Sequence, residues 1–214
     1  MVKLRHYLDV MSSWCYYAEP NLERLREKYG SKLSYGWRIA LVKDLPLSRA
    51  QVEWFYKRSG SISGTHLNPE WFQGPLGSLD ANLAAEAARE LGFADDRVRL
   101  ALARAALVDG IPVQYRSNAA EVVAVTTGVE PDKVLTVMDD PKVKARIDES
   151  EAEFAGLRID QRPAFVLRSS IGDAAVFSGV WSFEPLDATI CAMLADVEKY
   201  AAFAAGNPPL PARP

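Results

Sequence analysis

A strand-to-helix turn near the N-terminus constrains this 214-residue chain more than any other stretch. The apolar run from Val2 to Val10 is typical of a strand, and apolar residues then recur at helical spacing as far as Tyr29. Ser12 and Cys15 fall one turn apart where that helix begins. The first N–H groups of a helix are unpaired and sit at the positive end of its dipole, so this position stabilises an anion such as a thiolate.

The sequence Ser12-Ser13-Trp14-Cys15, preceded by Asp9, resembles the active-site segment of the DsbA-like branch of the thioredoxin superfamily. In that branch a Cys-x-x-Cys motif opens the helix, and here a serine occupies the first cysteine position. A serine at this position is similar to the pattern of kappa-class glutathione transferases and 2-hydroxychromene-2-carboxylate isomerases. Those relatives lack the second cysteine, which this chain keeps. The resemblance makes Ser12 and Cys15 the candidate catalytic residues.

The order of the remaining patterns predicts an α/β fold. A second strand alternates from Leu33 to Ile39, and together with the first strand and helix it forms a parallel βαβ unit. Helical patterns follow, then a hairpin near residues 164–177 and a final helix over 183–200. This is the order of a thioredoxin fold with a large all-helical insertion between its βαβ half and its ββα half. We therefore expect residues 1–44 and 157–203 to form a thioredoxin-like domain, 45–156 the helical insertion domain, and 207–214 a disordered tail.

Composition restricts the classes of partner. A net charge of -3 gives no basic excess for nucleic acid or an anionic membrane. No apolar run approaches the roughly 20 residues needed to span a bilayer, and no signal-peptide pattern is present, so we expect a cytoplasmic protein. The two cysteines, Cys15 and Cys191, cannot make a zinc site alone, and no other metal site is predicted. Because Cys191 lies in an apolar helical stretch, we expect it to be buried and inert.

Two aromatic pairs, Trp54-Phe55 and Trp71-Phe72, flank a segment of small residues, Ser59 to Gly64. Large aromatic side chains are mostly found in cores, and that is the main expectation for these pairs. The alternative is a lid or pocket wall over the Ser12 turn. The segment between the pairs is rich in Ser and Gly, which predicts a flexible loop.

The resemblance also implies a cis proline before the third strand, and Arg162-Pro163 matches that position. In the fold such a proline lies against the active-site turn and leaves a backbone edge for a thiol peptide. Ser12, Trp14, Arg162 and Pro163 are therefore the predicted residues of a glutathione site. One departure concerns residues 177–181, Phe-Ser-Gly-Val-Trp, where the kappa-class enzymes have a Ser-Asp pair that holds the glutamyl end of glutathione.

Three functions follow from these features. The first is a glutathione-dependent isomerase or transferase, in which Ser12 favours the glutathione thiolate for attack on an apolar aromatic electrophile. The second is a thiol-disulfide oxidoreductase that uses Cys15 as a single thiol; dithiol exchange is disfavoured because the attacking cysteine is missing. The third is a non-enzymatic binding module. The resemblance further implies a small-molecule substrate and a homodimer.

Overall fold

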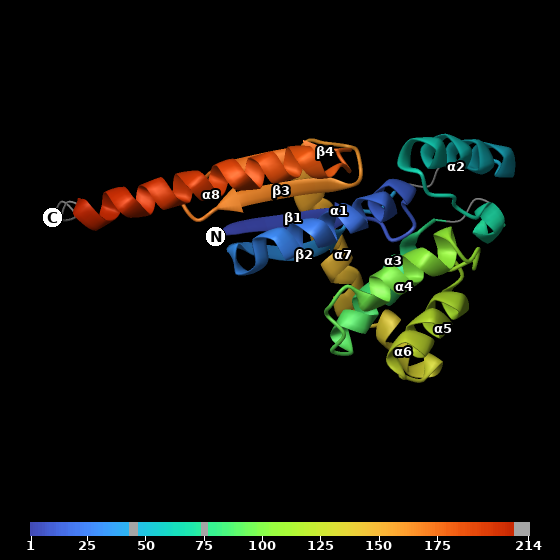
Figure 1. The fold of residues 1–214 in the computed structure, drawn as a ribbon. Helices are drawn as coiled ribbons and strands as arrows, with labels where there is room; N and C mark the ends of the chain where they lie inside the picture. The colour runs from blue at the N-terminus through green and yellow to red at the C-terminus, as the bar shows by residue number, and fades with distance from the viewer. Residues whose placement is uncertain (43–46, 74–76, 208–214) are drawn as a thin grey trace.

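Four strands form one mixed sheet in the order β2-β1-β3-β4 (Figure 1). The computed structural model describes residues 1–42, 47–73 and 77–207. Strand β1 (Val2–Leu8) runs parallel to β2 (Leu33–Ile39), whereas β3 (Ala164–Ser169) is antiparallel to β1 and β4 (Ala174–Ser178) is antiparallel to β3. The parallel βαβ unit and the C-terminal hairpin are thus both as predicted.

The helices fall into two groups. Helices α1 (Ser13–Tyr29) and α8 (Phe183–Gly206) belong to the two halves of the sheet, and the rest lie between β2 and β3. These are α2 (Arg49–Ser63), α3 (Leu79–Glu90), α4 (Arg97–Leu107), α5 (Arg116–Thr127), α6 (Pro131–Met138) and α7 (Pro141–Gly156), with short 3-10 helices at Gly30–Lys32 and Pro69–Trp71. This order confirms the predicted α/β class, a thioredoxin fold with a helical insertion.

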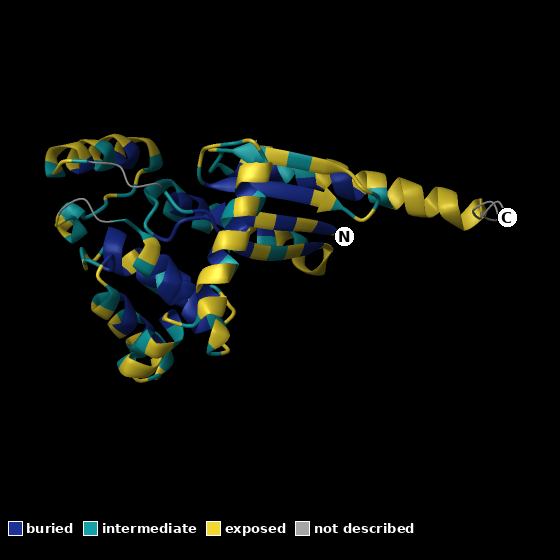
Figure 2. Cartoon of the chain, turned by 180° about the vertical axis from the view of Figure 1, so that it is seen from behind, coloured by how far each residue is buried: buried dark blue, intermediate teal, exposed yellow. Residues whose placement is uncertain are grey.

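Helices pack on both faces of the sheet, although Lys3 and Arg5 of β1 stay exposed on one of them. Alternate residues of β1, including Val2 and Leu4, pack with Phe165 of β3 against the apolar stripes of α1 and α8. On the opposite face Tyr7 and Val166 pack against Phe154 of α7. The strands near the middle of the sheet are correspondingly buried (Figure 2). This arrangement fixes the C-terminal end of β1, from which the turn to α1 leaves.

The inserted helices build a core of their own that continues into the turn between β1 and α1. Helix α3 buries alanines that allow close contact with α5, α6 and α7. The same cluster of buried side chains includes Val10 and Cys15, which lie in the turn and in α1. The insertion therefore packs directly on the segment that carries Ser12. The domain boundaries proposed from the sequence stay a prediction, and residues 43 and 44 lie outside the described part of the chain.

The segment from Ser59 to Gly64 is a helix end, and the predicted loop is wrong. Helix α2 continues to Ser63, and Gly64 ends it with a φ of 75°. A capping box between Ser48 and Gln51 starts the helix, which outweighs the low helix propensity of its last turns. Gly60 belongs there for packing, since a Cβ atom would come within 2.8 Å of the Thr65 carbonyl oxygen.

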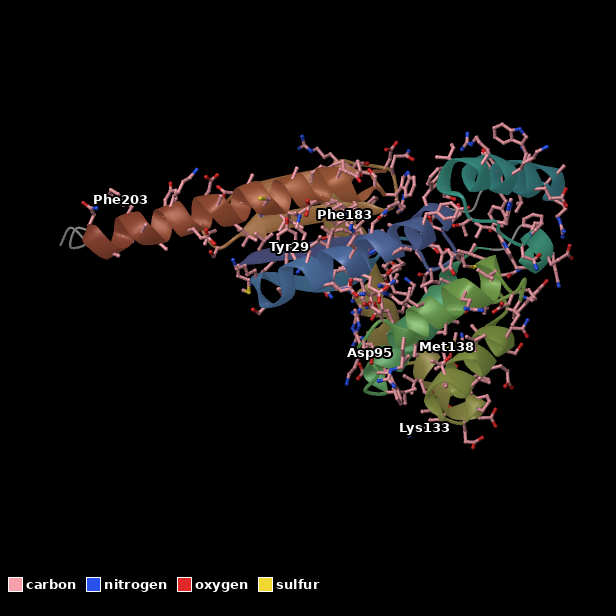
Figure 3. The ribbon with its side chains drawn as sticks, viewed as in Figure 1. Tyr29, Asp95, Lys133, Met138, Phe183 and Phe203 are labelled. Carbon is pink, nitrogen blue, oxygen red and sulfur yellow. The ribbon has the colours of Figure 1, made fainter. Side chains whose placement is uncertain are left out.

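Helix α8 extends past the sheet, and its distal part is exposed (Figures 1 and 2). It ends at Gly206, six residues beyond the predicted Tyr200, and Phe203 lies far from the sheet (Figure 3). Cys191 is exposed, so its predicted burial is wrong.

Of the predicted tail, residues 208–214 lie outside the described part. Among the helices that the structure describes, none combines the length and the apolarity that crossing a membrane demands.

Candidate functional site

Ser12 is the N-cap of α1, at the strand-to-helix turn that the sequence predicted. Its backbone is extended, with φ and ψ of -81° and 118°, and its Oγ accepts a long hydrogen bond of 3.4 Å from the N–H of Cys15. The N–H of Ser12 donates to the carbonyl of Asp9 at 3.0 Å, which closes the turn after β1. An N-cap hydroxyl of this kind satisfies one of the unpaired donors at the helix start. Its own hydrogen can donate either to the Cys15 sulfur or to a ligand.

Cys15 faces the opposite way, into the protein. Only 3 % of its surface is exposed, and it packs in the cluster that joins the insertion to the sheet. Burial raises the pKa of the Cys15 thiol to about 12, and the hydrogen bond from Ser12 lowers it by less than burial raises it. A thiol with this pKa is protonated at neutral pH, and the neutral thiol is a poor nucleophile.

Asp9 is a fully buried carboxylate beneath the turn. Its Oδ1 accepts from the N–H of Met11 at 2.9 Å, and its Oδ2 accepts from the N–H of Val42 at 2.8 Å and from the Ser78 hydroxyl. Burial raises the pKa of Asp9, and these hydrogen bonds oppose the rise. The carboxylate thus ties the turn to the segment after β2 and to the start of α3.

The Arg162–Pro163 peptide bond is cis, as the resemblance implied. The carbonyl of Pro163 accepts from the N–H of Gly179 at 2.9 Å. The guanidinium of Arg162 donates to the carbonyls of Ala40 and Asp160, each at 3.0 Å, and its Cζ lies 4.4 Å from the Phe154 ring centroid. Within the described residues, no backbone hydrogen bond joins the N–H or C=O of Arg162 to another residue.

A cavity of about 760 Å³ opens beside this turn. Ser12, Trp14 and Arg162, three of the four residues predicted for a glutathione site, line it together. Cys15 and Pro163 are buried and do not appear on its wall. The outer wall comes from α2 and from the 3-10 helix that ends at Trp71. The cavity's aromatic lining consists of Trp14, Phe55, Tyr56, Trp71, Phe72 and Phe154.

The aromatic pairs thus divide between two roles. Phe55, Trp71 and Phe72 line the cavity, which is the alternative expectation of a pocket wall. Trp54 is 56 % exposed and belongs to neither the core nor the wall. Sequence reasoning missed Tyr56, which lies one position beyond the Trp54-Phe55 pair and shares the cavity side with Phe55. The capping box at Ser48 was the available signal, because it makes this stretch a helix with one face toward the turn.

The charged groups of the cavity are two arginines and three acids. Arg58 lies at Cζ distances of 5.0 and 5.3 Å from the ring centroids of Trp54 and Phe55. Among the residues that the structure describes, neither Arg58 nor Arg162 is ion-paired with a carboxylate. The acids are Asp9, Asp160 and Glu151, and Glu151 accepts from the N–H of Leu41 at 2.6 Å. The cavity therefore offers spare guanidinium donors against a mostly apolar wall.

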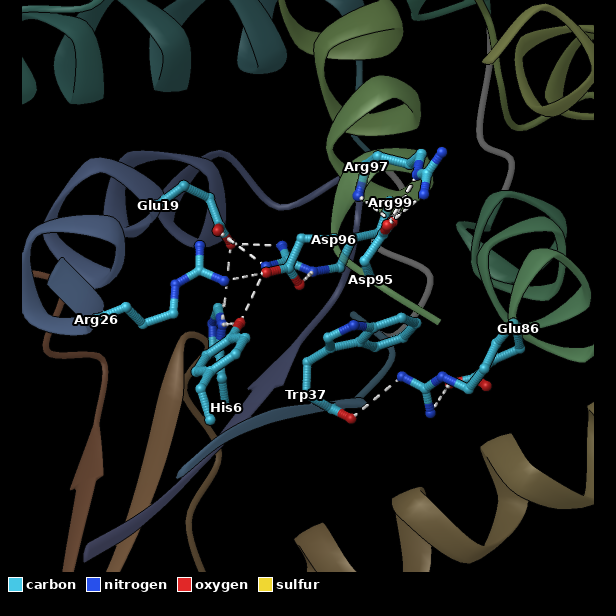
Figure 4. Close-up of polar contacts among 11 residues, drawn as sticks. His6, Glu19, Arg26, Trp37, Glu86, Asp95, Asp96, Arg97 and Arg99 are labelled. Carbon is cyan, nitrogen blue, oxygen red and sulfur yellow. Dashed lines mark hydrogen bonds and ion pairs between the residues drawn. The ribbon is translucent and has the colours of Figure 1, made fainter. Parts of the chain in front are cut away.

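A polar network joins α1, α4 and the sheet (Figure 4). Arg99 of α4 donates to both carboxylate oxygens of Glu19 at 2.6 and 3.0 Å and to the Tyr35 hydroxyl at 2.9 Å. Asp96 bridges Arg99 and Arg26. His6, fully buried, lies 3.3 Å from the Tyr35 hydroxyl through Nδ1. The network therefore joins the inserted α4 to α1 and to the sheet.

The segment that departs from the kappa-class pattern lies close to Trp14. The Trp181 ring centroid is 5.9 Å from that of Trp14, and the Trp181 carbonyl accepts from the Asn21 side chain at 2.9 Å. An aromatic contact therefore lies where the resemblance would place a ligand-binding aspartate.

Comparison with known proteins finds solved structures of similar fold. No curated protein matches the sequence. A solved structure described as a putative protein disulfide isomerase from Nitrosomonas europaea has 20 % identity and a TM-score of 0.73, covering 93 % of this chain and 98 % of that one. The cytosolic disulfide reductase DsbM from Pseudomonas aeruginosa has 21 % identity and a TM-score of 0.71, covering 94 % and 100 %. A second DsbM structure, with GSH, has 18 % identity and a TM-score of 0.69, covering 94 % and 99 %.

These structural likenesses show the fold. The family is shown by a sequence model, described as the DSBA-like thioredoxin domain, that matches residues 3–190 and so spans nearly the whole chain. That match contains the turn at Ser12, the inserted helices and the cis proline. The chain belongs to the DSBA-like thioredoxin domain family.

Proposed function

We propose that this protein is a glutathione-dependent isomerase or transferase, in which Ser12 stabilises the glutathione thiolate for attack on an apolar aromatic electrophile. One observation carries the proposal: at the start of α1 the hydroxyl of Ser12 lines the cavity, whereas the thiol of Cys15 is buried. The nucleophile must then come from a ligand, because the cavity wall offers a hydroxyl where the family's redox motif would place a thiol.

Two effects favour a thiolate beside Ser12. The Ser12 hydrogen can donate to the sulfur, and a hydrogen bond to a charged group contributes about 1.5 to 3 kcal/mol. The N-terminus of α1 adds about 0.3 to 1 kcal/mol for an anion. Since about 1.4 kcal/mol corresponds to one pKa unit, these effects together lower the pKa of the bound glutathione thiol by about one to three units. That lowering converts a large share of bound glutathione to thiolate at neutral pH.

The peptide part of glutathione suits the rest of the cavity. The N–H and C=O of Arg162 can pair with its cysteinyl backbone, as expected at an edge next to a cis proline. Arg58 and Arg162 offer guanidinium donors for its carboxylates. The glutamyl-binding aspartate is missing near Val180, so we expect weak affinity, near millimolar, or about 4 kcal/mol. The DsbM structure with GSH gives the proposal a precedent on the same fold.

The oxidoreductase alternative has the support of the family and of DsbM, described as a disulfide reductase. It requires Cys15 to act as a single thiol, and burial with a pKa of about 12 opposes that role. A binding module without catalysis is the remaining alternative. A cytoplasmic location, which suits a glutathione enzyme, and a homodimer complete the proposal.

The test is a pH titration of glutathione in the presence of excess protein, followed by the ultraviolet absorbance of the thiolate. With wild type the thiol pKa falls, and with Ser12→Ala it returns toward that of free glutathione. Ser13→Ala, the same change at a neighbouring cavity residue that caps nothing, is the matched control and keeps the lowered pKa. Calorimetry on the same proteins separates binding from thiolate formation. An unchanged thiol pKa in wild type, or equal lowering by Ser12→Ala, contradicts the proposal.

A further inference from the structure

The hydroxyl of Tyr56 has an unused hydrogen at the cavity wall. Trp71 Nε1 donates to the Tyr56 oxygen at 2.7 Å. An indole N–H can only donate, so the phenol is the acceptor in this bond and its own hydrogen is free for another partner. Within residues 1–42, 47–73 and 77–207, no acceptor is bonded to that hydrogen. Both Tyr56 and Trp71 line the cavity that Ser12 also lines.

The position of Tyr56 relative to α1 is fixed by a neighbouring contact. Ser59, one helical turn further along α2, lies 3.1 Å from the Tyr17 hydroxyl of α1, and both of these residues are buried. Ser59 also donates a long bond of 3.4 Å to the carbonyl of Tyr56. The tyrosine on the cavity wall is therefore held by α1, the same helix that presents Ser12 at its start. Such a donor is preorganised rather than recruited by the ligand.

We propose that Tyr56 is a catalytic residue that donates a hydrogen bond to the carbonyl oxygen of an aromatic α,β-unsaturated ketone or aldehyde. The proposal rests on the proposed function, because the attacking group is the glutathione thiolate held by Ser12. It names the electrophile by its chemistry: the compound needs an aromatic ring for the wall of Phe55, Trp71 and Phe72, and an oxygen that gains charge during attack.

The electrons balance without any other reactant. The thiolate sulfur forms a bond to the β-carbon, the C=C electron pair moves to the carbonyl, and negative charge develops on the oxygen that Tyr56 faces. In a transferase the α-carbon then takes a proton, which balances the one lost from the glutathione thiol. In an isomerase the α–β bond rotates, the electron pair returns to form C=C, and the thiolate leaves.

The protonation state of Tyr56 suits this role. Burial raises the pKa of the Tyr56 phenol, and the bond from Trp71 opposes the rise without cancelling it. The hydroxyl therefore keeps its proton throughout the neutral range and stabilises the oxyanion as a donor.

The first experiment needs neither glutathione nor turnover. Benzylacetone, a saturated and unreactive ketone, is bound to wild type, to Tyr56→Phe and to Tyr115→Phe, and the infrared carbonyl stretch of the bound ketone is recorded. We expect a lower frequency in wild type than in Tyr56→Phe, because only wild type donates to the carbonyl. Tyr115→Phe removes an exposed phenol that does not line the cavity and keeps the wild-type frequency. Equal frequencies in wild type and Tyr56→Phe, or no binding of benzylacetone by wild type, overturn the proposal.

The second experiment uses rates with glutathione. Removing one oxyanion donor lowers kcat by about 100-fold in well-studied sites, so we expect Tyr56→Phe to lower kcat/KM for benzylideneacetone by about 10- to 100-fold. Benzyl bromide has no oxygen, and its leaving bromide takes the charge. We therefore expect Tyr56→Phe to change kcat/KM for benzyl bromide by less than about twofold. An equal loss of kcat/KM with both substrates would mean that Tyr56 has only a structural role. If no thiolate forms in wild type, the proposed function fails, and the infrared result still decides the role of Tyr56.

Discussion

Ser12 lines the cavity and Cys15, one helical turn away, does not, although the Cys15 N–H donates to the Ser12 hydroxyl. The side chains point to opposite sides of the helix start, one toward the ligand space and one into the core. In a dithiol motif the exposed first position attacks and the buried second position resolves. This chain keeps that division of exposure while replacing the attacking thiol with a hydroxyl.

The two cysteines should differ sharply in reactivity. Cys191 is exposed on α8, whereas Cys15 is buried with a pKa of about 12. We expect a thiol reagent to label one cysteine quickly in the native protein and the second only after unfolding. Cys191→Ser should remove the fast phase, and Cys15→Ser should leave it intact. Fast labelling of the Cys191→Ser variant would show that Cys15 is accessible, which would revive the single-thiol oxidoreductase.

Ser12→Cys should create a redox couple with Cys15. The new thiol would stand at the N-terminus of α1 on the cavity side, where its pKa is lowered and attack on a disulfide is favoured. We expect wild type to be inactive in insulin reduction and Ser12→Cys to gain measurable activity. Ser13→Cys, at the next cavity-lining position, serves as the matched control and stays far less active. Strong activity of wild type would mean that Cys15 carries the chemistry despite its burial.

Asp9→Asn should destabilise the turn, although the side chains of aspartate and asparagine have nearly the same shape. The carboxylate accepts from Met11, Val42 and Ser78 through both oxygens, and an asparagine can offer only one oxygen. Its NH₂ group would face at least one buried donor, which costs about 1 to 3 kcal/mol of unfolding free energy. Urea unfolding measures the loss, with the exposed Asp160→Asn as control. An equally stable variant would show that burial of the charge costs as much as its hydrogen bonds supply.

Local patterns predicted the parts of this fold that local chemistry decides. The strand-to-helix turn at Ser12 and the C-terminal hairpin were predictable because alternation, capping and turn residues act within a few positions. The exposure of Cys191 was also readable, since the buried stripe of α8 runs through Leu186, Ile190 and Met193, and position 191 lies about 100° off it. The prediction that Cys191 is buried was wrong because it used the overall apolarity of the stretch and not the helical period of its apolar residues.

The cavity wall and the buried network could not be predicted in the same way. Tyr56 meets Trp71 across 15 positions, and its anchor Ser59 meets Tyr17 across 42. Arg99 joins Glu19 of α1 across 80 positions. No local propensity encodes such contacts, because they depend on how the insertion folds back on the sheet. The cis state of Pro163 became predictable only through the resemblance, since a trans proline starting a strand fits the local sequence equally well.

The stability of the protein should fall at mildly acidic pH because of His6. Burial lowers the pKa of His6 well below its usual 6.5, and the neighbouring charge of Arg99 lowers it further. Glu19 lies 3.9 Å from its Nδ1, but both of its carboxylate oxygens already accept from Arg99, so it does not restore protonation. The Tyr35 hydroxyl lies 3.3 Å from the same nitrogen, and Asp96 is ion-paired with Arg99.

The sign follows from which state binds the proton. The folded pKa is the lower one, so between the two pKa values the unfolded chain holds more protons, and unfolding becomes easier as pH falls below 6.5. From about pH 8 to about pH 5, His6 should remove at most about 2 kcal/mol of unfolding free energy. His6→Phe, which can keep the contact with Phe165, should lack this part of the pH dependence. His66→Phe, at the other histidine, is the control and should retain it. Parallel urea-derived stability curves for wild type and His6→Phe would mean that His6 binds protons equally well in the folded and unfolded chain.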